Sequence, residues 1–206
     1  SDVVEVNVED AVAGFHIEMW AKAPELYSVR IISPTGERTA GVRVQQDGRE
    51  VYRFVFENTQ VIIDYHIVGT ATGDQLIYIR FDRPTSGIWT IEVNGDYSIE
   101  GRYHMWLPIT GLIAGDISFI RSNPDTTITM PGNAAAPMTV GGYNAGNDSI
   151  YLNSSRGYTA SGLVKPDFAA PGVNVIGPAP GNRFEARSGT SIAAAITAGA
   201  AALYLE

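Results

Sequence analysis

Hydrophobic and polar residues alternate along the first 119 residues, which is the period-two pattern of strands that bury one face. Val4, Val6 and Val8 show it first, and Phe15 and Ile17 continue it with polar neighbours between them. Further strand-like runs complete this part of the chain: Tyr27–Ile32, Val42–Val44, Val51–Phe56, Val61–Val68, Leu76–Phe81, Ile88–Val93 and Tyr103–Leu107. The pattern predicts strands, and no helix, across residues 1–119.

Turn-forming residues separate these runs. Ser33-Pro34-Thr35-Gly36, Asp47-Gly48 and Asn94-Gly95-Asp96 are the clearest turn signals. Many short strands at such regular spacing are typical of an antiparallel sandwich. We therefore predict a β-rich domain over residues 1–119, a sandwich of jelly-roll type.

Residues 120–206 have a different texture, in which Pro, Gly, Ala, Ser and Asn dominate. Short apolar segments such as Met138–Val140 and Val173–Ile176 alternate with loops, and the chain finishes with an Ala-rich segment from Ser191 to Leu205. Alanine is a strong helix former, and apolar residues on every face are typical of a buried helix. We predict a second domain of short strands that finishes in a buried helix.

Composition narrows the functional classes. The chain of 206 residues has a formal net charge of -8, which argues against nucleic acid or an anionic membrane as a partner. It has no cysteine, which excludes disulfides, thiol catalysis and cysteine-ligated metals. No apolar run reaches the roughly 20 residues of a membrane helix, and the N-terminal residues show no signal-peptide pattern.

The candidate chemistry lies at the start of the predicted helix, in Ser188-Gly189-Thr190-Ser191. A glycine lets the chain turn sharply, and the N–H groups at a helix N-terminus are unpaired and carry partial positive charge. Such groups can stabilise an oxyanion that forms beside a serine oxygen. The same residues can also act only as a helix cap, a very common role for Ser and Thr.

Four segments in order resemble the subtilase (subtilisin-like) family. They are Thr139-Val140-Gly141-Gly142, Ser154-Ser155-Arg156-Gly157, Lys165-Pro166-Asp167…Ala170-Pro171-Gly172, and Gly189-Thr190-Ser191-Ile192-Ala193. The resemblance covers residues from about 124 to the end. It implies that residues 120–206 are the C-terminal part of an α/β subtilisin-like domain, that Ser191 is the nucleophile, and that its own N–H is one oxyanion donor.

The other catalytic groups of a subtilase have no match in this chain. His16, His66 and His104 all lie in the β-rich part, and none is followed by the glycine of the family's histidine motif. We expect these histidines to be sheet-face or surface residues. The chain is then a C-terminal fragment, inactive alone, whose Asp, His and oxyanion Asn are supplied upstream. Residues 1–119 would be an inserted jelly-roll, similar to that of clostridial germination-type subtilases.

Two other functional classes stay open. The β-rich part can be a binding or scaffold module, with Trp20, Trp89 and Trp106 as an exposed platform, although tryptophans of this kind belong more often to a core. A parent that has lost its Asp or His would be a pseudoprotease.

The resemblance also bears on cofactors and partners. We expect no cofactor and find no metal-loop spacing, although subtilases often bind a structural calcium in segments outside this chain. The expected partner is a protein or peptide substrate. Half of an α/β sheet leaves an unpaired edge, so the fragment can self-associate. A secreted, cell-surface or spore-associated bacterial location is expected.

Overall fold

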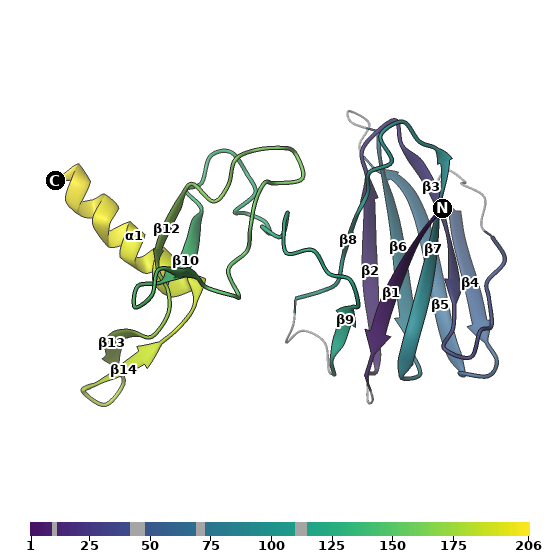
Figure 1. The fold of residues 1–206 in the computed structure, drawn as a ribbon, viewed down its shortest axis with the longest axis horizontal. Helices are drawn as coiled ribbons and strands as arrows, with labels where there is room; N and C mark the ends of the chain where they lie inside the picture. Colours follow the sequence, from purple (N-terminus) through teal and green to yellow (C-terminus); the bar gives the residue numbers. More distant parts are fainter. Residues whose placement is uncertain (10–11, 42–47, 69–72, 110–114) are drawn as a thin grey trace. The chain divides into compact units, whose positions relative to one another are not determined.

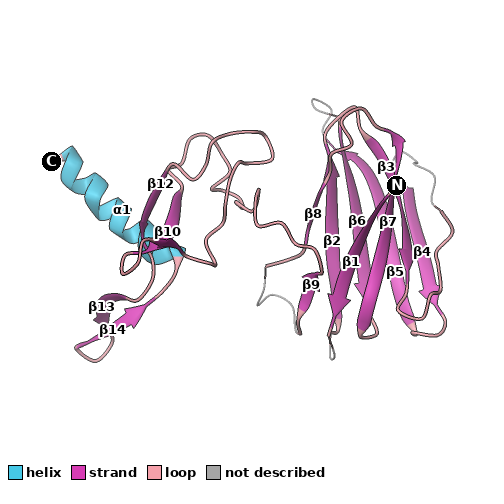
Figure 2. Ribbon diagram, in the orientation of Figure 1, coloured by secondary structure: helices cyan, strands magenta, loops and turns pink. Residues whose placement is uncertain are grey.

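The computed structural model describes residues 1–206 with the exception of 10–11, 42–47, 69–72 and 110–114. The described residues divide into two compact units, Ser1–Ser122 and Asn123–Glu206. Strands dominate the N-terminal unit, loops and short strands make up most of the C-terminal unit, and the described residues contain a single α-helix at the C-terminal end (Figure 2). The prediction of a β-rich chain that finishes in one helix is confirmed.

Two antiparallel sheets form the N-terminal unit (Figure 1). The four-stranded sheet has the order β3-β7-β1-β9 and contains β1 (Asp2–Val8), β3 (Leu26–Ile32), β7 (Gly87–Tyr97) and β9 (Ile117–Phe119). The five-stranded sheet has the order β4-β5-β6-β2-β8 and contains β2 (Gly14–Ala21), β4 (Gly48–Phe54), β5 (Thr59–Val68), β6 (Asp74–Asp82) and β8 (His104–Trp106). The predicted runs lie on these strands, apart from Val55 and Phe56 in the turn after β4, while Val42–Val44 lies outside the described residues. The prediction of a turn at Asn94-Gly95-Asp96 is wrong, because these residues lie within β7.

The two sheets bury their inward-facing residues in one hydrophobic core. Trp89 is fully buried there, and its ring meets those of Phe54 and Phe81 edge to face, with centroids 5.1 and 5.3 Å away. Gln75 joins the sheets, because its side-chain amide on β6 exchanges hydrogen bonds of 2.8 and 2.9 Å with the backbone of Tyr27 on β3. The hypothesis of a tryptophan platform is therefore wrong for Trp89.

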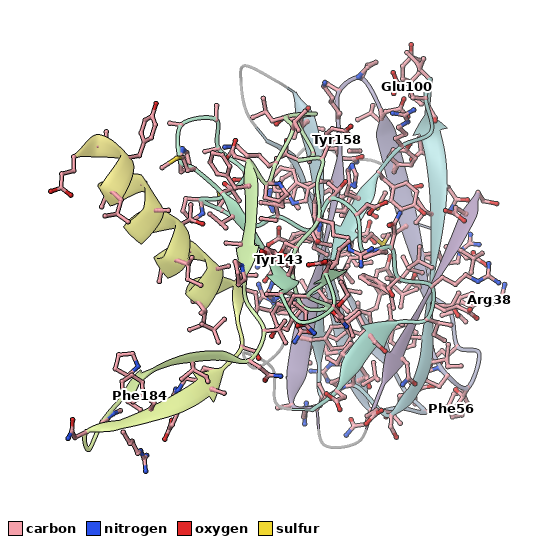
Figure 3. The ribbon with its side chains drawn as sticks, turned by 60° about the vertical axis from the view of Figure 1, so that its left-hand side comes forward. Arg38, Phe56, Glu100, Tyr143, Tyr158 and Phe184 are labelled. Atoms are coloured by element: carbon pink, nitrogen blue, oxygen red, sulfur yellow. The ribbon has the colours of Figure 1, made fainter. Side chains whose placement is uncertain are left out.

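The C-terminal unit contains short strands and the helix α1 (Thr190–Leu205). Its strands are β10 (Val140–Asn144), β11 (Ser149–Ile150), β12 (Phe168–Pro171), β13 (Val175–Ala179) and β14 (Arg183–Arg187). The sheet order is β11-β10-β12, in which β10 and β12 are parallel, and β13 and β14 form a separate antiparallel hairpin. Phe184 lies on that hairpin (Figure 3) and is 76% exposed.

The prediction of a buried helix is wrong for this chain. Of the residues of α1, only Ala193 is buried, while Leu203, Tyr204 and Leu205 are largely exposed. The helix contacts β10 and β12, its one buried residue is in the first turn, and most residues of the later turns are exposed. None of the described helices is long and apolar enough to cross a bilayer.

Candidate active site

Ser191 lies in the first turn of α1, directly after Thr190. Its side chain is exposed, and its hydroxyl takes part in none of the side-chain hydrogen bonds among the described residues. The helix is preceded by Gly189, and no side chain caps it. The interpretation of Thr190 or Ser191 as a simple helix cap therefore has no support in the geometry, and the Ser191 hydroxyl is open to a reacting partner.

The backbone at the start of α1 offers hydrogen-bond donors beside Ser191. The first helical bonds run from the N–H groups of Ile192 and Ala193 to the carbonyl oxygen of Gly189, at 3.1 and 3.4 Å. The N–H groups before them, including that of Ser191, lie in the part of a helix where donors have no intrahelical acceptor. No acidic side chain lies in the first turn to offset the positive end of the helix dipole. An anionic oxygen would be stabilised at this position.

Two backbone hydrogen bonds hold the start of the helix against the sheet. The Gly189 N–H donates to the Gly172 carbonyl oxygen, and the Gly172 N–H donates to the Tyr143 carbonyl oxygen, both at 2.8 Å. Tyr143 belongs to β10 (Figure 3), so this relay joins the sheet to the residue just before the helix. The position of Ser191 is therefore set by backbone geometry two residues away rather than by side-chain contacts of its own.

Glycines make this close approach feasible. A Cβ atom at Gly172 would lie 3.2 Å from the Gly189 oxygen, 3.3 Å from the Gly142 Cα and 3.6 Å from the Ala193 Cβ. A Cβ at Gly142 would meet Tyr151 at 3.3 Å and Thr190 at 3.6 Å. The Gly-Gly and Ala-Pro-Gly segments therefore act through the space that they leave behind the first helical turn.

An ion pair between a buried lysine and a more exposed aspartate supports the parallel strands. The ammonium group of Lys165 donates hydrogen bonds of 2.7 Å to the Pro137 carbonyl oxygen and to Oδ2 of Asp167. The same carboxylate oxygen accepts the Thr139 N–H at 2.7 Å, just before β10 begins. Lys165, followed by the Thr139 backbone donor, lowers the pKa of the Asp167 carboxyl. The Lys-Pro-Asp segment thus has a structural role in joining the ends of β10 and β12.

The histidines belong to the other unit. His16 on β2 stacks on Tyr78 with ring centroids 4.8 Å apart, and His104 on β8 stacks on Trp106 at 5.3 Å. Burial lowers the pKa of His104, and His66 lies on β5. These positions confirm the prediction of sheet-face histidines. The sequence of the C-terminal unit contains no histidine, so that unit holds no imidazole for Ser191.

No metal site emerges from the residues that the structure describes. Within those ranges, no group of three or more His, Asp or Glu side chains is placed to hold one ion.

The sequence analysis did not single out the features that position Ser191, namely the Tyr143 carbonyl and the N–H of Gly189. Their only sequence signal is the concentration of glycine on both sides of the contact.

Comparison with known proteins gives a family match for the C-terminal part of the chain. Residues 110–206 match the model of the subtilase family, peptidase S8. The chain is 38% identical over 106 residues to the serine protease AprX of Bacillus subtilis, covering 41% of this chain and 24% of AprX. It is 32% identical over 93 residues to the C5a peptidase of Streptococcus pyogenes, covering 45% of this chain and 8% of that protein.

Among solved structures, the CspB protease of Clostridium perfringens matches with a TM-score of 0.89 and 27% identity. That match covers 100% of this chain and 44% of the CspB chain, so the chain spans less than half of each of these relatives. The ordered motifs, the family match and the likeness to a protease structure agree with one another. Residues 110–206 of this chain thus match the subtilase family of serine proteases, and the protease relatives agree with that match.

Proposed function

We propose that this chain supplies the nucleophile segment of a subtilisin-like serine endopeptidase, with Ser191 as the nucleophile. The observation that carries the proposal is the exposed Ser191 hydroxyl at the donor-rich start of α1, inside the family match at residues 110–206. In this role the serine oxygen attacks a peptide carbonyl and forms an acyl-enzyme, which water then hydrolyses. The substrate class is a protein or peptide.

The remaining catalytic groups come from polypeptide outside these 206 residues. A histidine takes the proton from the Ser191 hydroxyl, and an aspartate holds that histidine in its working tautomer. The Ser191 N–H donates one hydrogen bond to the oxyanion, and a side-chain donor outside this sequence supplies another. The chain by itself then has no peptidase activity.

The exposed surface of the C-terminal unit supports the proposal that further polypeptide packs against it. β12 is the last strand of its sheet among the described residues, and large apolar side chains such as Leu152 and Leu203 are 87% and 75% exposed. Exposed apolar side chains and an unpaired strand edge are each typical of surface that another element covers. In the parent enzyme, the rest of the α/β domain covers this face.

The β-rich part is then an insertion of about 119 residues in the catalytic domain, of jelly-roll type. The nested antiparallel pairs β1·β7 and β2·β6 on opposite sheets support this finer assignment. The organisms of the three relatives are bacteria, which supports a bacterial source. A secreted, cell-surface or spore-associated location and a structural calcium elsewhere in the parent stay predictions.

The test uses the parent protein that contains this sequence, expressed whole. A fluorophosphonate probe is expected to label it at Ser191, and Ser191→Ala is expected to abolish both labelling and cleavage of a casein substrate. Ser118→Ala removes an exposed serine of β9 and serves as the control, with unchanged labelling. A folded parent that neither labels nor cleaves is a pseudoprotease and refutes the proposal. Cleavage by the 206-residue chain alone, lost in Ser191→Ala, would refute the external histidine.

A further inference from the structure

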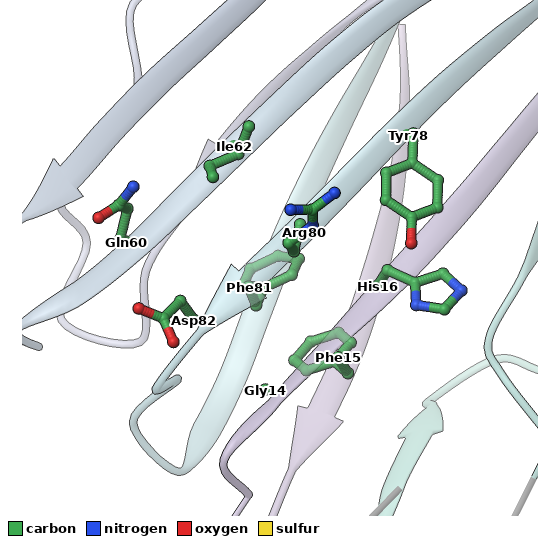
Figure 4. Close-up of a pocket in the computed structure, with 9 residues that line it drawn as sticks. All are labelled: Gly14, Phe15, His16, Gln60, Ile62, Tyr78, Arg80, Phe81 and Asp82. Carbon is green, nitrogen blue, oxygen red and sulfur yellow. The ribbon is translucent and has the colours of Figure 1, made fainter. Parts of the chain in front are cut away.

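The outer face of the five-stranded sheet carries a shallow groove of about 470 Å³, in the N-terminal unit (Figure 4). Its lining comes from β2, β5 and β6, which are neighbours in that sheet. The outward-facing side chains of the groove are His16, Gln60, Ile62, Tyr78, Arg80 and Asp82. None of them belongs to the proposed catalytic role, which lies in the other unit.

Strand register brings these side chains together. Gln60 lies opposite Asp82, and Arg80 lies opposite both Ile62 and His16, so the side chains share one face of the sheet. Gly14 is opposite Asp82 and has no side chain, which leaves the corner of the groove open. A Cβ atom at Gly14 would lie 2.8 Å from the Phe81 carbonyl oxygen, so a larger residue does not fit there without a backbone shift.

The aromatic wall of the groove is held in place. Tyr78 stacks on His16 with an interplanar angle of 25°, and the Arg80 guanidinium carbon lies 5.6 Å from the centre of the Tyr78 ring. Figure 4 shows Tyr78 and His16 on one side of Arg80, and Gln60 and Asp82 on the other. The groove therefore combines a fixed aromatic side with a polar side.

The polar side has spare hydrogen-bonding capacity. Among the described residues, Arg80 has no carboxylate partner and the Gln60 amide makes no side-chain hydrogen bond, while Asp82 has only a 3.6 Å contact with Arg83. All three polar groups are planar, and planar groups of this kind can bridge two neighbouring hydroxyl groups with paired hydrogen bonds. A ligand with many adjacent hydroxyls and a flat apolar C–H face would match both sides.

We propose that this groove binds a carbohydrate, with one sugar ring against Tyr78 and its hydroxyls paired with Gln60, Arg80 and Asp82. A peptide fits less well. β6 is paired with β5 on one side and with β2 on the other, and β5 is also paired with β4, so no strand can be added between the strands that line the groove. Ile62 is the one aliphatic side chain of the lining, which offers little to an apolar peptide residue.

The experiment titrates the 206-residue chain with cellohexaose, chitohexaose and polygalacturonate oligomers, and with hexa-alanine and hexaglutamate as peptide probes, by isothermal calorimetry. At least one oligosaccharide is expected to bind. Arg80→Ala and Gln60→Ala are each expected to weaken that binding about tenfold or more, as loss of ligand hydrogen bonds implies. Arg102→Ala, an exposed arginine outside the groove, is the matched control with unchanged affinity.

All of the changed side chains point outward, so each variant is expected to keep an intact sandwich. Thermal unfolding of each variant checks this. Absence of binding by every saccharide overturns the proposal. So does saccharide binding that Arg80→Ala and Gln60→Ala leave unchanged, or tighter binding of either peptide. None of these outcomes depends on Ser191, so a failure here does not affect the protease proposal.

Discussion

The two units of this chain are stabilised in different ways. All of the buried hydrophobic residues except Ala170 and Ala193 lie in the N-terminal unit, in a core shared by two sheets. The C-terminal unit instead buries polar groups such as Ser154 and Lys165, which bond to the backbone. The first unit thus has a complete core within this sequence, whereas the second is shaped by close backbone contacts and leaves its apolar faces open.

The proposed nucleophile and the packed core lie in different units. Ser191 sits on the unit with the sparse core, where glycines and backbone hydrogen bonds set its position. A site of this kind is sensitive to small changes of backbone spacing, while a packed core is sensitive to lost volume. Each of the following predictions tests one side of the comparison.

The largest effect is expected from Trp89→Ala in the N-terminal core. Removal of a fully buried tryptophan in contact with Phe54 and Phe81 is expected to lower the free energy of unfolding by about 3–5 kcal/mol. Urea denaturation followed by circular dichroism measures the change. Trp20→Ala, on the half-exposed outer face of β2, is the control with a smaller loss. Equal losses of unfolding free energy in the two variants would contradict the interpretation that Trp89 belongs to the packed core of the N-terminal unit.

Gly172→Ala is expected to destabilise the C-terminal unit by roughly 1–3 kcal/mol, because the new methyl group meets Gly189, Gly142 and Ala193. Amide hydrogen exchange should be faster in β10 and β12 and unchanged in β5 and β6. Gly177→Ala provides the control, since a Cβ at Gly177 meets nothing within 4 Å. If both variants exchange like the native chain, the close approach behind the helix does not position Ser191.

A pH-dependent effect is expected in the N-terminal unit through Glu25. Its carboxylate accepts the N–H groups of Glu100 and Ile99 at 2.7 and 2.9 Å, and these donors lower the pKa of Glu25 to about 2. Because the folded pKa is depressed below the ordinary value of 4.5, the stabilisation is present above pH 4.5 and is lost as the pH falls toward 2.

Glu25→Gln isolates that contribution from the other carboxylates. The difference in unfolding midpoint between the native chain and the variant should be constant near neutral pH and should shrink steadily below pH 4.5. Denaturant titrations at a series of pH values measure it. A difference that does not vary with pH would show that the Glu25 carboxylate is not held by these donors.

The smallest change in stability is expected from Leu203→Ser with Leu205→Ser on α1. Both side chains are largely exposed, so the free energy of unfolding should change by less than about 0.5 kcal/mol. Self-association of the chain should decrease, because apolar surface is removed. Sedimentation velocity measures it, with Ala193→Ser, at the buried end of the helix, as the destabilising contrast. Unchanged self-association would mean that this helix does not form the self-association surface.

Most secondary-structure elements of this fold could be predicted from local sequence patterns. Alternation located the strands of the sandwich, since a half-buried strand repeats every two residues whatever its partners. Alanine content located the helix to within one residue of its start at Thr190. Burial was harder to predict. An apolar helix is buried only when other elements cover it, and within this chain Ala193 in the first turn is the one helix residue that is buried.

The candidate site divides in the same way. Sequence alone determined that a serine follows Gly-Thr at a helix start, in the order of motifs typical of subtilases, because those are properties of consecutive residues. Tertiary structure decided that the Ser191 hydroxyl is exposed, that Gly172 and Tyr143 fix its backbone, and that His16 and His104 face other aromatic rings. These facts depend on which distant segments of the chain contact one another. Strand pairing and packing between elements determine those contacts, and the order of residues within one segment does not.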